Sequence, residues 1–172
     1  MGIPQYKTWQ EQVKHSITSI EELSKYIPIS SKEKERLSKV TNKFPLRVTP
    51  YFLNLINPDD KNDPLRLQVL PSAEELVEEK GEELVAWDKE SLFVVKGIEH
   101  KYPDRVAFLV TRSCAGWCRH CVRKVMCEDV KGLHLSELSF EEIDKATEYI
   151  KKHEVIWDVL LTGGDLFMIS EE

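Results

Sequence analysis

The first part of the chain combines apolar positions at helical spacing with polar residues that can cap a helix. Ser19-Ile-Glu-Glu22 and Ser30-Ser-Lys-Glu33 both place a serine three residues before a glutamate, which is the capping-box pattern. Apolar residues follow these patterns at helical spacing: Leu23, Tyr26, Leu37 and Val40. The pattern predicts short helices in this region.

The middle of the chain has a different pattern. From Phe44 to Pro71 it is rich in proline, asparagine and aspartate, which favour turns, and the apolar stretch Tyr51 to Ile56 predicts one helical turn within it. Ser72 to Trp87 carries an acidic helical pattern, and a polar loop is expected from there to His100. The apolar residues are too many for a disordered tether.

Two apolar runs predict buried strands. Val106 to Val110 is continuous and bounded by turn signals, as in a parallel sheet, and Val155 to Thr162 is the second run. Between them, Ser139-Phe-Glu-Glu142 is a capping box that opens an amphipathic helix expected over Phe140 to His153. Strand, long loop, helix and strand form one βαβ unit, which we expect to be parallel and right-handed.

Composition narrows the possible functions. The chain has 172 residues, of which 41% are hydrophobic and 31% charged, with a net charge of -6. This acidic balance gives no reason to expect a nucleic-acid or membrane-surface partner. No apolar run approaches the roughly 20 residues of a membrane span, and the first residues lack the apolar stretch of a secretory signal. These observations predict a cytoplasmic protein.

The strongest chemical signal is Cys114-Ala-Gly-Trp-Cys118-Arg-His-Cys121, directly after the first predicted strand. In a cytoplasmic protein such a cluster more often binds metal or does redox chemistry than forms disulfides. Three thiolates from one loop can hold three irons of a four-iron cluster and leave the fourth iron open. A zinc site with Cys127 or His120 as fourth ligand is the alternative, as are three unrelated buried thiols. Zinc ligands usually come as two separated pairs.

The second predicted strand ends in Gly163-Gly164-Asp165, one βαβ unit after the cysteines. Glycine pairs are common at turns between strands and helices, so the motif alone is a weak signal. Its position one βαβ unit after the cysteines makes it a stronger one. Together the two motifs resemble the radical S-adenosylmethionine enzymes, and within them the lysine 2,3-aminomutase family. The resemblance covers nearly the whole chain, and its further segments are Trp9 to Val13, Ile17 to Pro28, Thr49 to Pro71, Tyr102 to Arg105, and Cys118 to Cys121 followed by Arg123-Lys124.

The resemblance implies roles around the cysteine loop. Cys114, Cys118 and Cys121 would bind the [4Fe-4S] cluster. S-adenosylmethionine would contact the turn formed by Gly163, Gly164 and Asp165. It would also lie near His120, inside the cysteine motif. From the residues alone, the alternative interpretation of His120 is a loop histidine, although its place between two cysteines favours a functional one.

Further roles implied by the resemblance concern the substrate and a second cofactor. Arg123 would pair with the substrate carboxylate, a role that suits a guanidinium. Tyr102 and Arg105 would line a pyridoxal phosphate site. Without the resemblance, Tyr102 to Arg105 reads as a turn before a strand, and Arg119, Arg123 and Lys124 read as a solvated basic patch.

The resemblance also implies a fold and a division of the chain. The expected class is α/β: the start of a partial TIM-like barrel of about six βα units, preceded by an N-terminal helical region. Residues 1–100 would form the helical and loop region, and residues 101–172 the beginning of the core, with two strands, the cluster loop and one helix. The chain is expected to stop after the second strand, before the lysine that forms the Schiff base with pyridoxal phosphate.

The implied activity is isomerisation, in which an amino group moves from the α- to the β-carbon of an amino acid such as lysine. A small amino acid would be the substrate, a flavodoxin or ferredoxin the electron donor, and the complete enzyme a homo-oligomer, whereas the fragment alone would be inactive. Where the family continues with basic residues, this chain has Val125-Met-Cys127. We interpret Cys127 as a packing or incidental thiol rather than a ligand, because a fourth thiolate would close the open iron. A radical enzyme without pyridoxal phosphate, or a zinc or iron-sulfur module without catalysis, remains the alternative.

Overall fold

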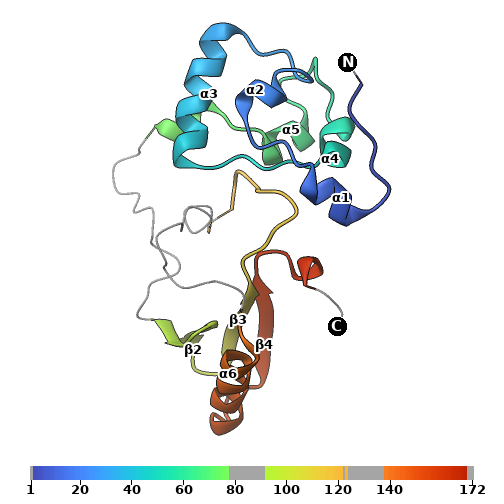
Figure 1. The fold of residues 1–172 in the computed structure, drawn as a ribbon. Coiled ribbons are helices and arrows are strands. Elements are labelled where there is room, and N and C mark those ends of the chain that lie inside the picture. The colour runs from blue at the N-terminus through green and yellow to red at the C-terminus, as the bar shows by residue number, and fades with distance from the viewer. Residues whose placement is uncertain (1, 78–91, 122, 124–137, 170–172) are drawn as a thin grey trace. The chain divides into compact units, whose positions relative to one another are not determined.

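The computed structural model of the chain describes residues 2–77, 92–121, 123 and 138–169 (Figure 1). The chain divides into a helical unit, Met1–Glu82 with Ala115–Glu128, and a sheet unit, Glu83–Cys114 with Asp129–Glu172. The division that the sequence predicts after residue 100 therefore falls inside a strand of the sheet unit, Ile98–Tyr102. Within the described ranges, no helix is both long and apolar enough to cross a membrane.

The helical unit is made of short helices, each preceded by a residue that caps it. They are α1 (Trp9–Lys14), α2 (Ile20–Leu23), α3 (Ser31–Lys43), α4 (Pro50–Leu55), α5 (Pro64–Val69) and the 3-10 helix η1 (Ala73–Leu76). A threonine, serine or aspartate before each helix accepts a hydrogen bond from a backbone N–H of its first turn. The caps predicted at Ser19 and Ser30 are confirmed, and α4 confirms the helical turn predicted over Tyr51 to Ile56.

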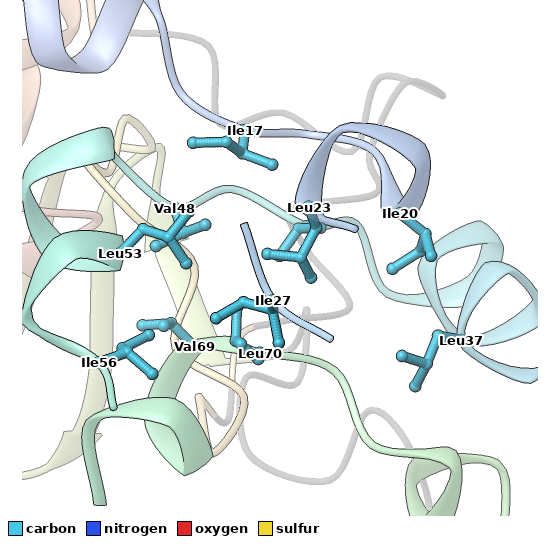
Figure 2. Close-up of a cluster of buried hydrophobic side chains, with 11 residues drawn as sticks. Ile17, Ile20, Leu23, Ile27, Leu37, Val48, Leu53, Ile56, Val69 and Leu70 are labelled. Carbon is cyan, nitrogen blue, oxygen red and sulfur yellow. The ribbon is translucent and has the colours of Figure 1, made fainter. Parts of the chain in front are cut away.

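One cluster of aliphatic side chains holds this unit together (Figure 2). The backbones of Ile17 and Val48 exchange two hydrogen bonds of 2.8 and 3.1 Å, which bring the segment before α2 beside the segment before α4. The buried members are Ile17, Ile20, Leu23, Ile27, Leu37, Leu46, Val48, Leu53, Ile56, Val69 and Leu70. Burying each such side chain contributes about 1.5–3 kcal/mol, so the cluster can order helices that are too short to be stable alone.

The described residues of the sheet unit form one four-stranded sheet in the order β1-β2-β3-β4. The strands are β1 (Phe93–Val95), β2 (Ile98–Tyr102), β3 (Arg105–Thr111) and β4 (Asp158–Gly163). The first three pair antiparallel, whereas β3 and β4 pair parallel and run side by side in Figure 1. Helix α6 (Phe140–Lys152) precedes β4 and packs its Ala146 against Ile98, Val106 and Phe108 of the sheet.

The predicted βαβ unit is confirmed in its main elements. β3 extends the predicted strand by one residue at each end, α6 matches the predicted helix closely, and the strands are parallel. The second strand starts three residues later than predicted. Of its predicted beginning, Val155 lies in a turn after α6, and the Trp157 backbone N–H donates to the Asp104 carbonyl at 3.0 Å.

Other expectations for this half of the chain are corrected. The polar loop predicted before His100 contains β1 and the start of β2; β1 pairs with β2, and β2 pairs with β3. The second strand is not buried as predicted: Leu160 is 63% and Leu161 53% exposed, because β4 is the outer strand of the sheet in the described residues. The described residues combine helices with a sheet that has a parallel strand pair, so the α/β class is confirmed. The sheet is not closed in the described residues, so the barrel stays a prediction. Of the acidic helix expected from Ser72, only η1 is described, and 78–87 lie outside the described residues.

Candidate functional site

In the sheet unit, the Gly-Gly-Asp turn packs against the backbone that leads into the cysteine loop. The Gly164 N–H donates to the Thr111 carbonyl at 2.6 Å, and the Asp165 N–H donates to the Ser113 carbonyl at 2.8 Å. These bonds continue the parallel pairing of β3 and β4 beyond the strand ends. The predicted turn thus lies beside the residue that precedes Cys114, at the carboxyl ends of two parallel strands, which is where ligands bind in such sheets.

Both glycines of this turn are required by close contact between backbones. Gly163 has a φ of 124°, and a Cβ atom there would overlap the Thr111 carbonyl oxygen. A Cβ atom on Gly164 would overlap the Ser113 carbonyl oxygen. The Asp165 carboxylate accepts a hydrogen bond from the Phe167 N–H at 3.1 Å and so caps the short 3-10 helix η4 (Leu166–Met168).

In the helical unit, Cys118 and Cys121 lie on one tight turn. The Cys121 N–H donates to the Cys118 carbonyl at 3.2 Å. Cys118 is exposed and Cys121 half-buried; Cys114, which belongs to the sheet unit, is also half-buried. The turn therefore presents two of the three predicted ligands within one short segment of backbone.

Arg119, between these two cysteines, is not the solvated residue that a basic patch requires. Its side chain is 8% exposed and forms an ion pair with Glu75, with Nε–Oε1 at 3.1 Å and Nη2–Oε2 at 2.7 Å. Nη1 donates to the Pro45 carbonyl at 2.9 Å and Nη2 to the Phe44 carbonyl at 3.3 Å. The basic-patch interpretation is wrong for Arg119, which is a buried structural arginine.

The preceding residues of the loop contact another part of the helical unit. The Trp117 N–H donates to the Arg47 carbonyl at 3.0 Å, and the Arg47 guanidinium lies 4.9 Å from the centre of the Trp117 ring. Neither Arg47 nor Glu75 was identified from the sequence as part of the site. Glu75 does carry a local signal, as the last residue of the Ser72-to-Glu75 capping box, but nothing in that pattern links it to Arg119.

Two further residues of the cysteine loop were predicted to lie near S-adenosylmethionine and the substrate. His120 is exposed and Arg123 is half-buried. Lys124 and Cys127 lie outside the described residues, so the structure leaves their predicted roles as they were.

Tyr102 and Arg105, predicted to line a pyridoxal phosphate site, lie at the opposite end of β3 from the cysteine loop. From Arg105 to Thr111 the strand makes six steps of about 3.3 Å, or roughly 20 Å. The Arg105 guanidinium donates to both carboxylate oxygens of Asp104, at 2.9 and 3.0 Å, and lies 5.8 Å from the Tyr102 ring centre and 5.9 Å from that of Trp157.

Asp104 is the negatively charged partner of Arg105 at this end of β3. Hydrogen bonds from the Arg105 guanidinium and from the Trp157 indole, the latter at 3.0 Å, lower the pKa of Asp104 to about 2. Its carboxylate is therefore ionised at neutral pH and neutralises Arg105. A phosphate at Arg105 would have to share the guanidinium with Asp104 or displace it.

The residues of the cysteine loop fit an iron-sulfur cluster by the chemistry of their donors. In the described part of the chain, no group of three or more histidine, cysteine or acidic side chains is gathered as a metal site. Thiolates at the observed three- and two-residue spacing remain suited to one cluster, and the turn from Cys118 to Cys121 keeps two of them on one segment.

Comparison with known proteins identifies the relatives of this chain. No protein-family model matches it. The L-lysine 2,3-aminomutase of Clostridium subterminale is 38% identical over 167 residues, which are 97% of this chain and 39% of that protein. The L-lysine 2,3-aminomutase of Bacillus subtilis is 33% identical over 169 residues, 97% of this chain and 35% of that protein.

A related enzyme with another substrate in its name matches equally well. The glutamate 2,3-aminomutase of Clostridioides difficile is 35% identical over 167 residues, again 97% of this chain and 38% of that protein. The chain thus spans well under half the length of these relatives, and their similarity extends over almost all of its own residues. From its identity to several aminomutases across both of its units, the chain belongs to the lysine 2,3-aminomutase family.

Proposed function

We propose that this chain forms the cluster-binding part of a radical S-adenosylmethionine aminomutase, which moves the α-amino group of an amino acid to the β-carbon. The observation that carries the proposal is the combination of aminomutase relatives with the cysteine triplet placed directly after β3. The Gly-Gly-Asp turn supports it, because hydrogen bonds to Thr111 and Ser113 bring that turn to the start of the cysteine loop. The relatives are named for lysine or glutamate, so the substrate is an α-amino acid.

In this proposal, each predicted residue of the cysteine loop and of the Gly-Gly-Asp turn has a defined role. Cys114, Cys118 and Cys121 bind three irons as thiolates and leave the fourth iron accessible. Asp165 and His120 hold S-adenosylmethionine. The two-pronged guanidinium of Arg123 orients the substrate carboxylate.

Cofactors supply the difficult chemistry in such an enzyme, and the protein supplies position and exclusion of water. When bound, the cluster with S-adenosylmethionine supplies one-electron chemistry, and pyridoxal phosphate supplies an aldehyde that holds the migrating amino group. Tyr102 supplies a phenol and Arg105 a half-exposed guanidinium, and both groups are chemically suited to bind a phosphate. The phosphate would have to displace Asp104 from the guanidinium or share it. An electron donor such as flavodoxin or ferredoxin completes the proposal.

Anaerobic reconstitution of the 172-residue chain with iron and sulfide tests the cluster. We expect about one four-iron cluster per chain, counted from bound iron, sulfide and visible absorbance. Cys118→Ser should abolish the cluster, whereas Cys127→Ala, the matched control outside the triplet, should retain it. Zinc binding in place of iron, loss of the cluster in Cys127→Ala, or its survival in Cys118→Ser would each contradict the assignment.

The open iron is tested separately. Adding S-adenosylmethionine to the reduced cluster should change its electron paramagnetic resonance spectrum, because an amino acid group would coordinate the fourth iron. An unchanged spectrum from a fully assembled cluster would contradict the radical enzyme and favour an iron-sulfur module without catalysis.

A further inference from the structure

One residue of the cysteine loop is bound by three separate segments of the helical unit. The Arg119 backbone N–H donates to the Gln68 carbonyl at 2.7 Å, next to the last residue of α5. Its side chain reaches the carbonyls of Phe44 and Pro45, after α3, and the Glu75 carboxylate in η1. These segments lie 44 to 75 positions earlier in the chain, so only the folded helical unit brings them to the loop.

We propose that the Glu75–Arg119 ion pair positions the cysteine loop, by holding the backbone between Cys118 and Cys121 in the shape that presents both thiols. Arg119 is a positioning residue, and Glu75 acts through it. The nature of the bound group, an iron-sulfur cluster, rests on the proposed function; the positioning itself rests on the contacts of Arg119.

The pair has the geometry that makes an arginine hard to replace. Two roughly parallel N–H donors meet the two oxygens of one carboxylate, and both side chains are buried, at 8% and 12% exposure. A lysine can supply the charge but not this planar fork. Removal of either partner breaks this buried ion pair, which is destabilising for the local structure.

The same contacts argue against a direct role of Arg119 in binding an anionic cofactor or substrate. Each of its three side-chain nitrogens donates to Glu75 or to a backbone carbonyl. A carboxylate or phosphate at this guanidinium would have to displace those acceptors from a buried position. Arg119 therefore acts on the flanking cysteines, through the backbone that it holds.

The first test uses the chain without any cluster. We would measure the rate at which iodoacetamide alkylates Cys121, resolved by peptide mass spectrometry, in the wild type and in Arg119→Met. We expect alkylation about tenfold faster in the variant, since losing one partner of a buried ion pair outweighs the 1.4 kcal/mol that a tenfold change represents. Glu75→Gln should show a smaller increase, because the amide still accepts one hydrogen bond.

Two control variants separate positioning from general stability. Leu53→Ala removes a buried side chain of the core cluster in the same unit, a cluster that does not include Glu75 or Arg119, and it should lower the melting temperature. Arg36→Met changes an exposed arginine on α3. With all variants held well below their melting temperatures, Cys121 should react at the wild-type rate in both controls. Equal rates in Arg119→Met and the wild type, or an equal rise in Leu53→Ala, would overturn the proposal.

The second test follows the reconstituted cluster during incubation with an iron chelator. We expect iron loss about tenfold faster in Arg119→Met than in Leu53→Ala, with Arg119→Lys in between. Equal rates would overturn the proposal. If the wild type assembles no cluster, the proposed function fails, and the alkylation rates still decide whether the ion pair positions the loop.

Discussion

Gly163 and Gly164 allow two stretches of backbone to meet at the ends of β3 and β4. Hydrogen bonds from Gly164 and Asp165 reach Thr111 and Ser113, and no side chain at either glycine would fit between those backbones. At the scale of single residues, the two glycines are thus needed because the backbones pack so closely. It sets where Asp165 lies relative to the start of the cysteine loop.

Replacement of one of these glycines should cost stability. In Gly164→Ala the new Cβ atom would overlap the Ser113 carbonyl oxygen, so the turn must move away from β3. We expect a loss of about 1–3 kcal/mol in the free energy of unfolding, measured by urea denaturation. Gly2→Ala is the control, because a Cβ atom there meets nothing within 4 Å. Equal stability of both variants would show that the turn is not held against Ser113.

At the scale of elements, an ion pair joins the β1–β2 turn to the start of α6. Lys96 Nζ lies 2.6 Å from Glu142 Oε1. The hydrogen bond from Lys96, and then the hydrogen bond from the Ser139 backbone N–H, lower the pKa of Glu142 from 4.5 to about 2. The glutamate thus serves both as the third residue of the α6 capping box and as the partner of a lysine far away in the chain.

This pair predicts a pH dependence of stability. Because the pKa of Glu142 is lower in the folded chain, its stabilising contribution is complete above its ordinary value of 4.5 and is lost as the pH falls toward about 2. Glu142→Gln should therefore lose less stability than the wild type between these pH values, as measured by thermal melts across that range. Glu141→Gln is the control on the exposed side of the helix. A wild-type pH profile in Glu142→Gln would contradict the assignment.

At the scale of the whole molecule, β4 leaves apolar side chains in contact with solvent. Leu160 and Leu161 are more than half exposed, and β4 is the outer strand of the sheet in the described residues. An outer strand also presents unpaired backbone groups along its edge, which can pair with another chain.

We therefore expect the 172-residue chain to self-associate. Sedimentation velocity should show larger species that increase with protein concentration, and Leu160→Lys should reduce them, because a charged side chain on an outer strand opposes strand pairing. Leu67→Lys is the control, since Leu67 is 58% exposed on α5 and outside the sheet. A monomeric wild type at all concentrations would show that this strand does not drive association.

Local patterns were sufficient for the elements whose signals lie close together in the chain. Ser19, Ser30 and Ser139 cap helices in the structure because each serine oxygen and the backbone N–H group from which it accepts are only three residues apart. The continuous apolar run around Phe108 was sufficient for β3 in the same way. The spacing of the three cysteines, and the resemblance that it supports, likewise come from a short segment and identified the family.

Tertiary structure decided what depends on partners distant in the sequence. β1 has only three residues and β2 is largely polar, and they are strands because β2 pairs with β3 and β1 pairs with β2. β4 is exposed because of its place in the sheet order, which a run of apolar residues does not reveal. Arg119 looks like a surface arginine in a basic segment, and only the folded helical unit places Glu75 and two backbone carbonyls around it. A sequence motif specifies which atoms can donate or accept, whereas the fold determines which of them are close enough to do so.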